Sequence, residues 1–594
     1  MVAREKVRPL AISLLSLAVA ACSDRNETPR RFELRASLAS DLRDRGLGAT
    51  VAHAPFGDAI HEVTAVRQAL GTPIGWSIRV PDESDEPELR LGVRHATGAG
   101  PVSVRLRLHD EAGRETVLWE TSLGAQPGNG SARTRVGLAA WGGLQVRLVF
   151  EAEGRGDGAV LWEHPDLLAR SARDRPPVVL ICVDTLRRDH VDVYSPRQLT
   201  PHLSELAADG VVFEHAIASS SWTLPSVATV MTGLAPTVHA AGRRVPVIEN
   251  ATLDDFRRYN AVEKGFVRFN RGLIYRFSAL RSDVDTLAET LARHYLTHAV
   301  NSNINLASVG NVLIQGFDSI VYRNQMPAGE ITRRSQRWLR ENADAQIFLY
   351  AHYLEPHEWR SSVNLEPASA GEARRIYADL VHQTDASVGE LLRELRDLGL
   401  YEDALLVFFS DHGEHFWDDT TGSIYGHGNT LDNLAVEVPL IVKFPHAEFA
   451  GRRVSSPVKL ADIFATVLAE TDLQVTSDAH FDLRSLRATL EETSADVPRT
   501  IVSEFTLKLD ELFALRHGDY KAVHNETLDH WSLRRASDEA TIDVSGPDAA
   551  LALAKFKKAA GAYRRRAARF EGPSQPIEVT AEELDHLSQL GYVR

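Results

Sequence analysis

The sequence predicts an α/β protein in which helices cover both faces of a sheet, preceded by an all-β sandwich. Two patterns lead to this prediction. From about residue 32 to 165, short segments alternate apolar and polar residues, as in half-buried strands. Beyond Pro177, continuous apolar runs such as 178–183 alternate with helical segments. A continuous apolar strand is buried on both faces, and strands that alternate with helices are typical of a covered, largely parallel sheet.

The first region, 32–165, is expected to form an antiparallel sandwich. Its clearest strand is 102–109, which is apolar on one face and polar on the other. Turns containing Gly or Pro separate the other expected strands, 88–95, 116–121, 133–138 and 145–151. Such a module could bind carbohydrate or act as a spacer, and no residue pattern marks a binding site. The turn at 154–158 and the charged run up to 175–177 mark its end.

The second region, 176–594, carries the α/β pattern. Further buried strands are expected at 347–351, 405–409 and 438–442. A helix should begin with Thr200 as its cap and Pro201 in its first position, and Gly210 should end it. The run from Thr286 to Glu289 has the pattern of a capping box. A locally basic helix is expected at about 548–569, either as a solvated face or as a contact with a membrane or partner.

Composition narrows the classes of function. The chain has 594 residues, with 66 Lys and Arg against 81 Asp and Glu, a net charge of −15. This acidic balance argues against nucleic acid as a partner, since non-specific binding to it requires clustered basic residues. Two cysteines exclude a disulfide scaffold. Cys182 lies in the apolar run 178–183 and is expected to be an inert buried thiol.

The N-terminus has the pattern of a targeting segment. Arg4, Lys6 and Arg8 precede an apolar run at 10–21, which is shorter than the roughly 20 residues that span a membrane. The run ends in Val-Ala-Ala-Cys at 19–22, which resembles a bacterial lipobox. Residues 1–22 are therefore expected to be a lipoprotein signal peptide, and Cys22 a lipid anchor in the bacterial cell envelope. Ser23 is similar to the residue found in lipoproteins of the outer membrane. The alternative is a plain secretory signal.

Polar side chains follow the expected buried strands. Asp184 follows 178–183, His352 follows 347–351, and Asp411 with His412 follows 405–409. The carboxyl ends of such strands converge on the ligand crevice. Carboxylates and imidazoles gathered there are ligands for Zn, Mn or Ca, in one or two sites.

Thr223 stands just before an apolar stretch, 227–233, that could form a short helix. A hydroxyl at a helix N-terminus lies where negative charge is favoured, and beside a divalent cation it would become a nucleophile. The same residue could simply cap the helix. The segment by itself leaves both interpretations open.

Several motifs occur together in one order. They are 183–190 (VDTLRRDH), 223–226 (TLPS) ahead of 232–234 (TGL), 302–303 (SN) before 316–318 (GFD), 410–414 (SDHGE), 425–428 (YGHG) and 438–441 (VPLI). This set, over about 176–470, resembles the sulfatase-like branch of the alkaline phosphatase superfamily, and the ending 583–592 is similar to that group. The resemblance implies an alkaline-phosphatase-like sheet.

The resemblance also implies roles for individual residues. Asp184, Asp411 and His412 would hold a cation, with Thr223 as nucleophile and fourth ligand. His352, His357 and His427 are similar to histidines that hold a second metal ion or protonate a leaving group, or else they form a hydrogen-bonded wall. Lys443 would neutralise the charge of the substrate, or lie as a solvated lysine at a strand end.

Three positions depart from the pattern of true sulfatases. Thr223 stands where those enzymes have the Cys or Ser that becomes formylglycine, Val227 where they have Arg, and Thr185 where they have a second Asp. Threonine cannot give the aldehyde, so we expect Thr223 to attack phosphorus directly.

Three hypotheses follow. The first is a metal-dependent hydrolase that cleaves phosphate or sulfate esters, with a glycan or lipid as substrate. The second is a transferase that moves phosphoethanolamine or phosphoglycerol onto envelope glycans. The third is a non-catalytic binding lipoprotein with a degenerate hydrolase domain. The insertion at 241–280 either covers the crevice and sets specificity or is a surface excursion.

Overall fold

The computed structural model describes most of the chain as one compact unit, Leu34–Arg594. The described residues are 35–37, 51–55, 61–98, 100–124, 131–169, 175–263, 267–307, 310, 312–362, 370–416, 426–475, 477–480, 482–491, 499–508 and 510–577. The expected signal segment 1–22, with Cys22, and the ending 583–592 lie outside them. Among the described helices, none is both long and apolar enough to cross a membrane.

Five parallel strands form the centre of the largest sheet. β11 (Val178–Val183) lies between β18 (Ile347–Tyr353) and β19 (Leu405–Phe409), and β16 (Leu296–Asn301) and β17 (Ser319–Tyr322) follow beyond β18. Next to β19, β20 (Glu437–Lys443) runs in the opposite direction, and β12 (Val211–Ile217) pairs with β20. The carboxyl ends of the parallel strands therefore share one edge of the sheet.

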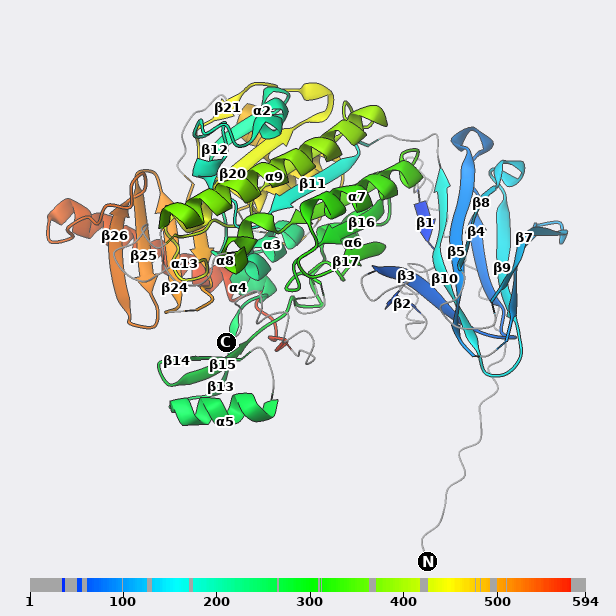
Figure 1. The fold of residues 1–594 in the computed structure, drawn as a ribbon, viewed down its shortest axis with the longest axis horizontal. Helices are drawn as coiled ribbons and strands as arrows, with labels where there is room; N and C mark the ends of the chain where they lie inside the picture. The colour runs from blue at the N-terminus through cyan, green and yellow to red at the C-terminus, as the bar shows by residue number, and fades with distance from the viewer. Residues whose placement is uncertain are drawn as a thin grey trace, which may run out of the picture. The chain divides into compact units, whose positions relative to one another are not determined.

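Helices cover both faces of this sheet, as the sequence predicts (Figure 1). In β11, Val178, Leu180 and Cys182 pack on one face and Val179, Ile181 and Val183 on the other, since side chains alternate along a strand. The first face carries α3 (Thr223–Thr232), α6 (Leu287–Leu291) and α11 (Asp462–Glu470). The second carries α2 (Pro201–Ala208), α7 (Ala328–Asn342) and α9 (Ala370–Asp397). Cys182 is a free, fully buried thiol.

The helix ends agree with the sequence in one case and differ in another. Thr286 and Glu289 form the predicted capping box of α6. Helix α2 begins at Pro201 as expected, but the Thr200 hydroxyl does not cap it and instead accepts the N–H of Asp192. The carboxylate of Asp385, on α9, accepts the N–H groups of His202 and Leu203. A tertiary contact thus replaces the local cap.

The N-terminal region is the predicted β-sandwich. One sheet has the order β4 (Ile74–Arg79), β9 (Gln145–Glu153), β6 (Val102–His109) and β7 (Glu115–Leu123). The other contains β3 (His61–Ala69), β10 (Ala159–Ala169), β5 (Pro87–Thr97) and β8 (Ser131–Gly137). Trp76, Phe150 and Trp162 lie in the core between them. β3 also pairs with β17, so the second sheet continues into the α/β sheet, and β10 extends past residue 165.

Two smaller sheets complete the described fold. β23 (Ile501–Glu504), β24 (Leu512–His517), β25 (Tyr520–Asn525) and β26 (His530–Arg535) form an antiparallel sheet, on which the expected basic helix, α13 (Pro547–Ala567), packs. The insertion at 241–280 forms β13 (Arg244–Ile248), β14 (Val267–Asn270) and β15 (Leu273–Phe277), with α5 (Leu253–Glu263) between β13 and β14 along the chain (Figure 1).

Candidate active site

Two strand ends bring acidic residues to the edge of the sheet. Asp184 directly follows β11, and its N–H donates to the carbonyl of Tyr353 at 2.9 Å, which continues the pairing with β18. Asp411 lies two residues beyond β19, and its side chain accepts the N–H of His412 at 2.9 Å. Because β11 and β19 are parallel neighbours, both carboxylates arrive at the same place.

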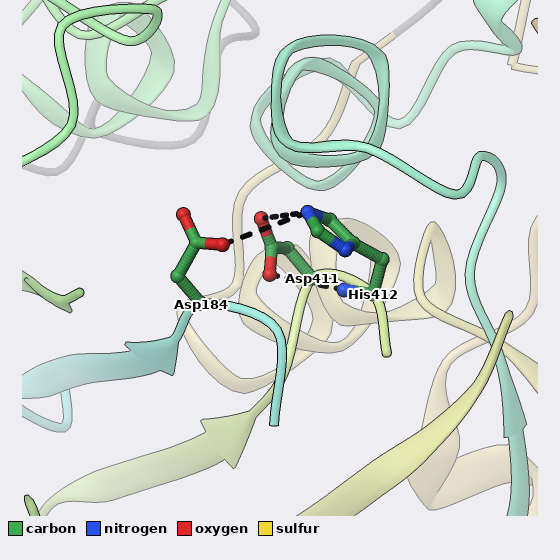
Figure 2. Close-up of side chains that lie close together, drawn as sticks. All are labelled: Asp184, Asp411 and His412. Carbon is green, nitrogen blue, oxygen red and sulfur yellow. Dashed lines mark hydrogen bonds and ion pairs between the residues drawn. The ribbon is translucent and has the colours of Figure 1, made fainter. Parts of the chain in front are cut away.

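Asp184, Asp411 and His412 point toward one another, as Figure 2 shows, and are fully buried. The Nε2 atom of His412 lies 3.6 Å from Asp184 Oδ1 and 3.5 Å from Asp411 Oδ2. Ligands held at about 2.1 Å in a tetrahedral site are about 3.4 Å apart. These separations fit a cation shared by the three side chains.

The hydrogen bonds leave ligand atoms directed into this cluster. The Nδ1 atom of His412 lies 2.9 Å from the carbonyl of Gly413, a contact that selects the tautomer with a lone pair on Nε2. Asp184 Oδ1 and Asp411 Oδ2 are buried and have no hydrogen-bond partner. Buried carboxylate oxygens are normally paired, so these two atoms have the environment of metal ligands.

The pKa values of Asp184 and Asp411 reflect the electrostatic repulsion between two carboxylates in one buried site. Burial and the nearby charge of Asp184 raise the pKa of Asp411 well above its ordinary value. Burial also opposes ionisation of Asp184, but the hydrogen bond from His352 and the neighbouring histidines lower its pKa below the usual range. Burial lowers the pKa of His412, which favours a neutral imidazole. A divalent cation would stabilise both ionised carboxylates.

Thr223 belongs to the same cluster. It is the first residue of α3, the N-cap position is held by Trp222, and no side chain caps the helix. The Thr223 hydroxyl instead lies 3.4 Å from Asp184 Oδ2 and 3.3 Å from His412 Nε2. The capping interpretation is therefore wrong. The Ser226 hydroxyl donates to the Asp411 carbonyl at 2.6 Å and fixes this end of α3 against the strand-end loop.

The imidazole of His352 contacts the carboxylate of Asp184. It lies within β18, and its Nε2 is 3.1 Å from Asp184 Oδ2. Its other ring nitrogen lies 2.8 Å from the hydroxyl of Tyr350. With both nitrogens engaged in this way, His352 can hold the carboxylate of Asp184 in position.

His427 and His357 form the side of the cluster beyond His412. The rings of His412 and His427 are 4.6 Å apart at their centroids, and those of His427 and His357 are 5.0 Å apart. The Nδ1 atom of His427 lies 3.4 Å from Glu414 Oε2. Burial lowers the pKa of His427 well below its ordinary value despite the charge of Glu414, so this imidazole is neutral near pH 7.

Lys443 does not reach the cluster. β20 runs antiparallel to β19, and Lys443 pairs with Leu406, at the start of β19, whereas Asp411 lies beyond its end. The Lys443 ammonium is buried and donates to the carbonyls of Tyr401, Glu402 and Ala404. Burial lowers its pKa to about 8. The structure therefore contradicts both predictions for Lys443, since the residue neither faces the site nor is solvated.

Three further residues lie at the site that the sequence did not single out for a role. The Asn303 side-chain amide donates to Asp184 Oδ2 at 2.8 Å and lies 3.4 Å from the Thr223 hydroxyl. Glu414 is fully buried and accepts the indole N–H of Trp359 at 3.0 Å. Arg360 Nε lies 3.9 Å from Glu414 Oε2. Asn303 and Glu414 belong to the motifs 302–303 and 410–414, and this membership could have pointed to a role at the site. Nothing in the sequence marks Arg360 in this way.

The departures and the insertion also have positions in the structure. Val227 is buried in the apolar core, and Thr185 adopts a left-handed backbone conformation, with φ of 58°, that directs its N–H toward Asp411 Oδ1 at 3.4 Å.

The insertion at 241–280 contacts the chain near His427. The hydroxyl of Tyr275, on β15, donates to the Leu507 carbonyl at 3.5 Å, and the Leu507 N–H donates to the Gly428 carbonyl at 2.7 Å.

A parallel-centred sheet with helices on both faces, and a cluster of Asp, His and Thr at its carboxyl edge, define an alkaline-phosphatase-like fold. The profile of the sulfatase family matches residues 176–473, half of the chain, and the protein belongs to the sulfatase family. This family generally uses a divalent metal ion.

Known relatives are distant. The human steryl-sulfatase is 29% identical over 174 residues, which cover 28% of this chain and 29% of that protein. The structure of Ps i-CgsB in complex with k-i-k-neocarrahexaose superposes with a TM-score of 0.51 at 18% identity, over 70% of this chain and 98% of that one. The phosphonate monoester hydrolase SpPMH from Silicibacter pomeroyi gives a TM-score of 0.50 at 19% identity, over 66% and 96%. Both structures share the fold.

Proposed function

We propose that the protein is a metal-dependent hydrolase that cleaves sulfate or phosphate esters, with the hydroxyl of Thr223 as nucleophile. The observation that carries this proposal is the position of that hydroxyl, 3.3 Å from His412 Nε2 and 3.4 Å from Asp184 Oδ2, at the first residue of α3. Membership of the sulfatase family supports the reaction class.

The cation would be held by Asp184, Asp411 and His412, with Thr223 as the fourth ligand. When bound, a divalent cation neutralises ester oxygens and lowers the pKa of a coordinated hydroxyl. One imidazole among four donors favours Zn or Mn over Ca, which takes six to eight oxygen ligands.

The residues of the chain supply the remaining steps. Thr223 Oγ1 gives up its proton and forms a bond to phosphorus or sulfur, while the bond from that atom to the ester oxygen breaks and the leaving oxygen takes up the proton. The dipole of the ten-residue helix α3 favours negative charge at this end. The Nδ1 atom of the neutral His427 lies against Glu414, so its Nε2 would accept the proton of Thr223 and pass it to the leaving oxygen. Water then attacks the covalent ester of Thr223, one of its protons returns to Thr223 Oγ1, and the inorganic anion is released.

The substrate is proposed to be an esterified saccharide or lipid. Ps i-CgsB, which shares the fold, was solved with a saccharide, and the fold also occurs in a phosphonate monoester hydrolase. Threonine at position 223 cannot form the aldehyde of formylglycine, and this favours direct attack on phosphorus. The same residue supports transfer of a phosphoryl-linked group to an acceptor alcohol as a second candidate. A modified acceptor in place of free phosphate would identify the transferase.

The nucleophile is tested by substitution. The chain from Ser23 onward is purified, loaded with Zn, Mn or Ca, and assayed with monoester, diester and sulfate-ester substrates. We expect Thr223→Ala to lower kcat by about a thousandfold or more, because the nucleophile is removed, and Thr223→Ser to retain measurable turnover. Full turnover by Thr223→Ala would show that another group attacks.

We further propose that the protein is a lipoprotein anchored through Cys22 in the bacterial outer membrane, on its periplasmic side or at the surface. The lipobox-like residues 19–22 support this location. Mass spectrometry of the mature chain should find acyl groups on an N-terminal Cys22. A mature chain that carries no acyl group would instead indicate a plain secretory signal.

A further inference from the structure

A guanidinium group lies on the side of the site that is remote from the nucleophile. Arg360 belongs to α8 (Trp359–Ser362), and its side chain is only 14% exposed. Its Nη2 lies 3.5 Å from His357 Nε2. The order from the cation cluster outward is therefore His412, His427, His357 and Arg360.

A second cation approaches the same place. Gly426 has φ of +80°, and a Cβ atom there would lie 2.7 Å from Arg360 Nη1 and 3.7 Å from Lys508 Nζ. Glycine suits this left-handed backbone, and the lack of a side chain leaves room for the guanidinium. Both positive groups thus converge on the residue just before His427. The N–H of Lys508 donates to the Gly428 carbonyl at 3.1 Å, which holds its backbone at the same turn.

Among the described residues, the carboxylate recorded beside Arg360 is that of Glu414, and the two form an ion pair without a direct hydrogen bond. Glu414 Oε2 lies 3.9 Å from Arg360 Nε, accepts the indole N–H of Trp359 and lies 3.4 Å from His427. Glu414 Oε1 accepts the N–H of His415 at 3.2 Å. Glu358, on the other side of His357, accepts from the Gln325 amide at 2.9 Å. The planar donors of a guanidinium suit a carboxylate, sulfate or phosphate group.

We propose that Arg360 and Lys508 bind an anionic group carried by the alcohol part of the ester, so that the enzyme prefers substrates with a second negative charge. This inference rests on the proposed function. The alcohol part is indicated because His427 and His357, which lie between Arg360 and the nucleophile cluster, occupy the side from which a leaving group would take its proton. The second charge would be a carboxylate, sulfate or phosphate on the leaving group.

Paired substrates test this assignment. The purified protein is assayed with 4-nitrophenyl phosphate and sulfate and with the corresponding 3-carboxy-4-nitrophenyl esters. We expect wild type to favour the carboxylated ester, and Arg360→Gln to lower the ratio of kcat/KM for the carboxylated over the uncarboxylated ester by about tenfold. Lys508→Gln should lower the same ratio, and Arg360→Lys should restore part of it. The matched control is Arg375→Gln, an exposed arginine on α9 paired with Asp379.

Equilibrium binding separates this inference from the proposed function. Calorimetry compares phenylphosphonate with 3-carboxyphenylphosphonate, neither of which can be hydrolysed. If wild type shows no turnover but binds the carboxylated compound more tightly, and Arg360→Gln loses that difference, the anion site stands and the proposed hydrolysis fails. If turnover occurs but neither kinetics nor binding distinguishes the paired compounds, the hydrolase stands and the anion site is wrong. An unchanged ratio in Arg360→Gln also overturns it, as does a wild type that shows neither turnover nor a carboxylate preference in binding.

Discussion

The side-chain amide of Asn303 reaches both Asp184 and Thr223, and its own position is set by its neighbours. The Asn303 N–H donates to the Asn301 side chain at 2.9 Å, and the Asn301 amide donates back to the Asn303 carbonyl at 2.7 Å. These bonds fix the turn at the end of β16. Asn303 is therefore placed to orient one carboxylate oxygen of Asp184 and the hydroxyl of Thr223.

Replacing this amide should impair the site without unfolding the protein. We expect Asn303→Ala to lower kcat about 10- to 100-fold, as substitutions of groups that orient metal ligands typically do. Steady-state kinetics, with circular dichroism to confirm folding, measures the effect. Asn342→Ala is the matched control, because that amide donates to the Trp338 carbonyl within α7. A loss confined to stability, with kcat intact, would give Asn303 a purely structural role.

Whether the sequence placed a residue correctly at the site depended on the direction of the strand before it. Asp184, Asp411 and His412 could be predicted because each follows a continuous apolar strand, and parallel neighbours end at one edge. Lys443 follows an equally apolar strand, but the sequence does not reveal that β20 runs in the opposite direction. Its end therefore lies at the far edge of the sheet. The position of Arg360 could not be predicted, since it depends on Glu414 and Gly426, which are distant from it in the sequence.

At the scale of elements, one buried carboxyl links three segments outside the site. Glu504 ends β23 and accepts the N–H of Thr237, on α4 (Pro236–His239), at 2.8 Å and the hydroxyl of Tyr563, on α13, at 3.1 Å. Burial raises the pKa of Glu504 from near 4.5 to about 7. The folded state thus retains a proton between these values that the unfolded chain loses. Stability from this group is complete below pH 4.5 and falls as the pH rises through 7.

Glu504→Gln should remove this pH dependence. A glutamine keeps an acceptor for Thr237 and Tyr563 and carries no charge, so we expect the variant to be more stable than wild type at pH 8. The rise in pKa from near 4.5 to about 7 corresponds to a difference in stability on the order of 3 kcal/mol. Urea unfolding at pH 5 and pH 8 measures it, with the exposed Glu341→Gln on α7 as control. Equal pH slopes in wild type and Glu504→Gln would assign the dependence to other groups.

The elements that the sequence revealed were those with a regular pattern. The boundaries of β6, β11 and β19 agree with the predicted segments 102–109, 178–183 and 405–409. The sequence did not predict β16, because its buried residues include Thr297, His298 and Asn301, which interrupt an apolar run. Their polar groups are satisfied by tertiary contacts, such as the bond from Thr297 to Asp318 at 2.9 Å. Local pattern cannot anticipate such pairing.

Across the whole molecule, the sandwich and the α/β region are joined more closely than the sequence indicates. β3 pairs antiparallel with β17, so that one edge of the α/β sheet is covered by a strand of the N-terminal region. Arg90, on β5, donates to Asp344, just beyond α7, at 2.8 Å. The class of each region followed from its own pattern. The pairing of their edges could not be predicted, because it depends on contacts between residues about 260 apart, as in Val63 with Ser319.

The whole fold should also respond to the cation, since the proposed ligands come from positions 184, 223, 411 and 412, far apart in the chain. A cation that binds only the folded state at 100 times its Kd stabilises it by about 3 kcal/mol. We expect Zn or Mn to raise the unfolding temperature and a chelator to reverse the rise. Asp411→Asn should abolish this response.

In the presence of a chelator, the Asp411→Asn variant should be more stable than wild type, because Asp411 and Asp184 are two buried carboxylates that oppose one another's ionisation. Differential scanning calorimetry with and without the cation compares the unfolding temperatures of the two proteins, with the exposed Asp379→Asn as control. Wild type should be the more stable protein with the cation, and the variant without it. A cation response that persists in Asp411→Asn would move the metal site away from this cluster.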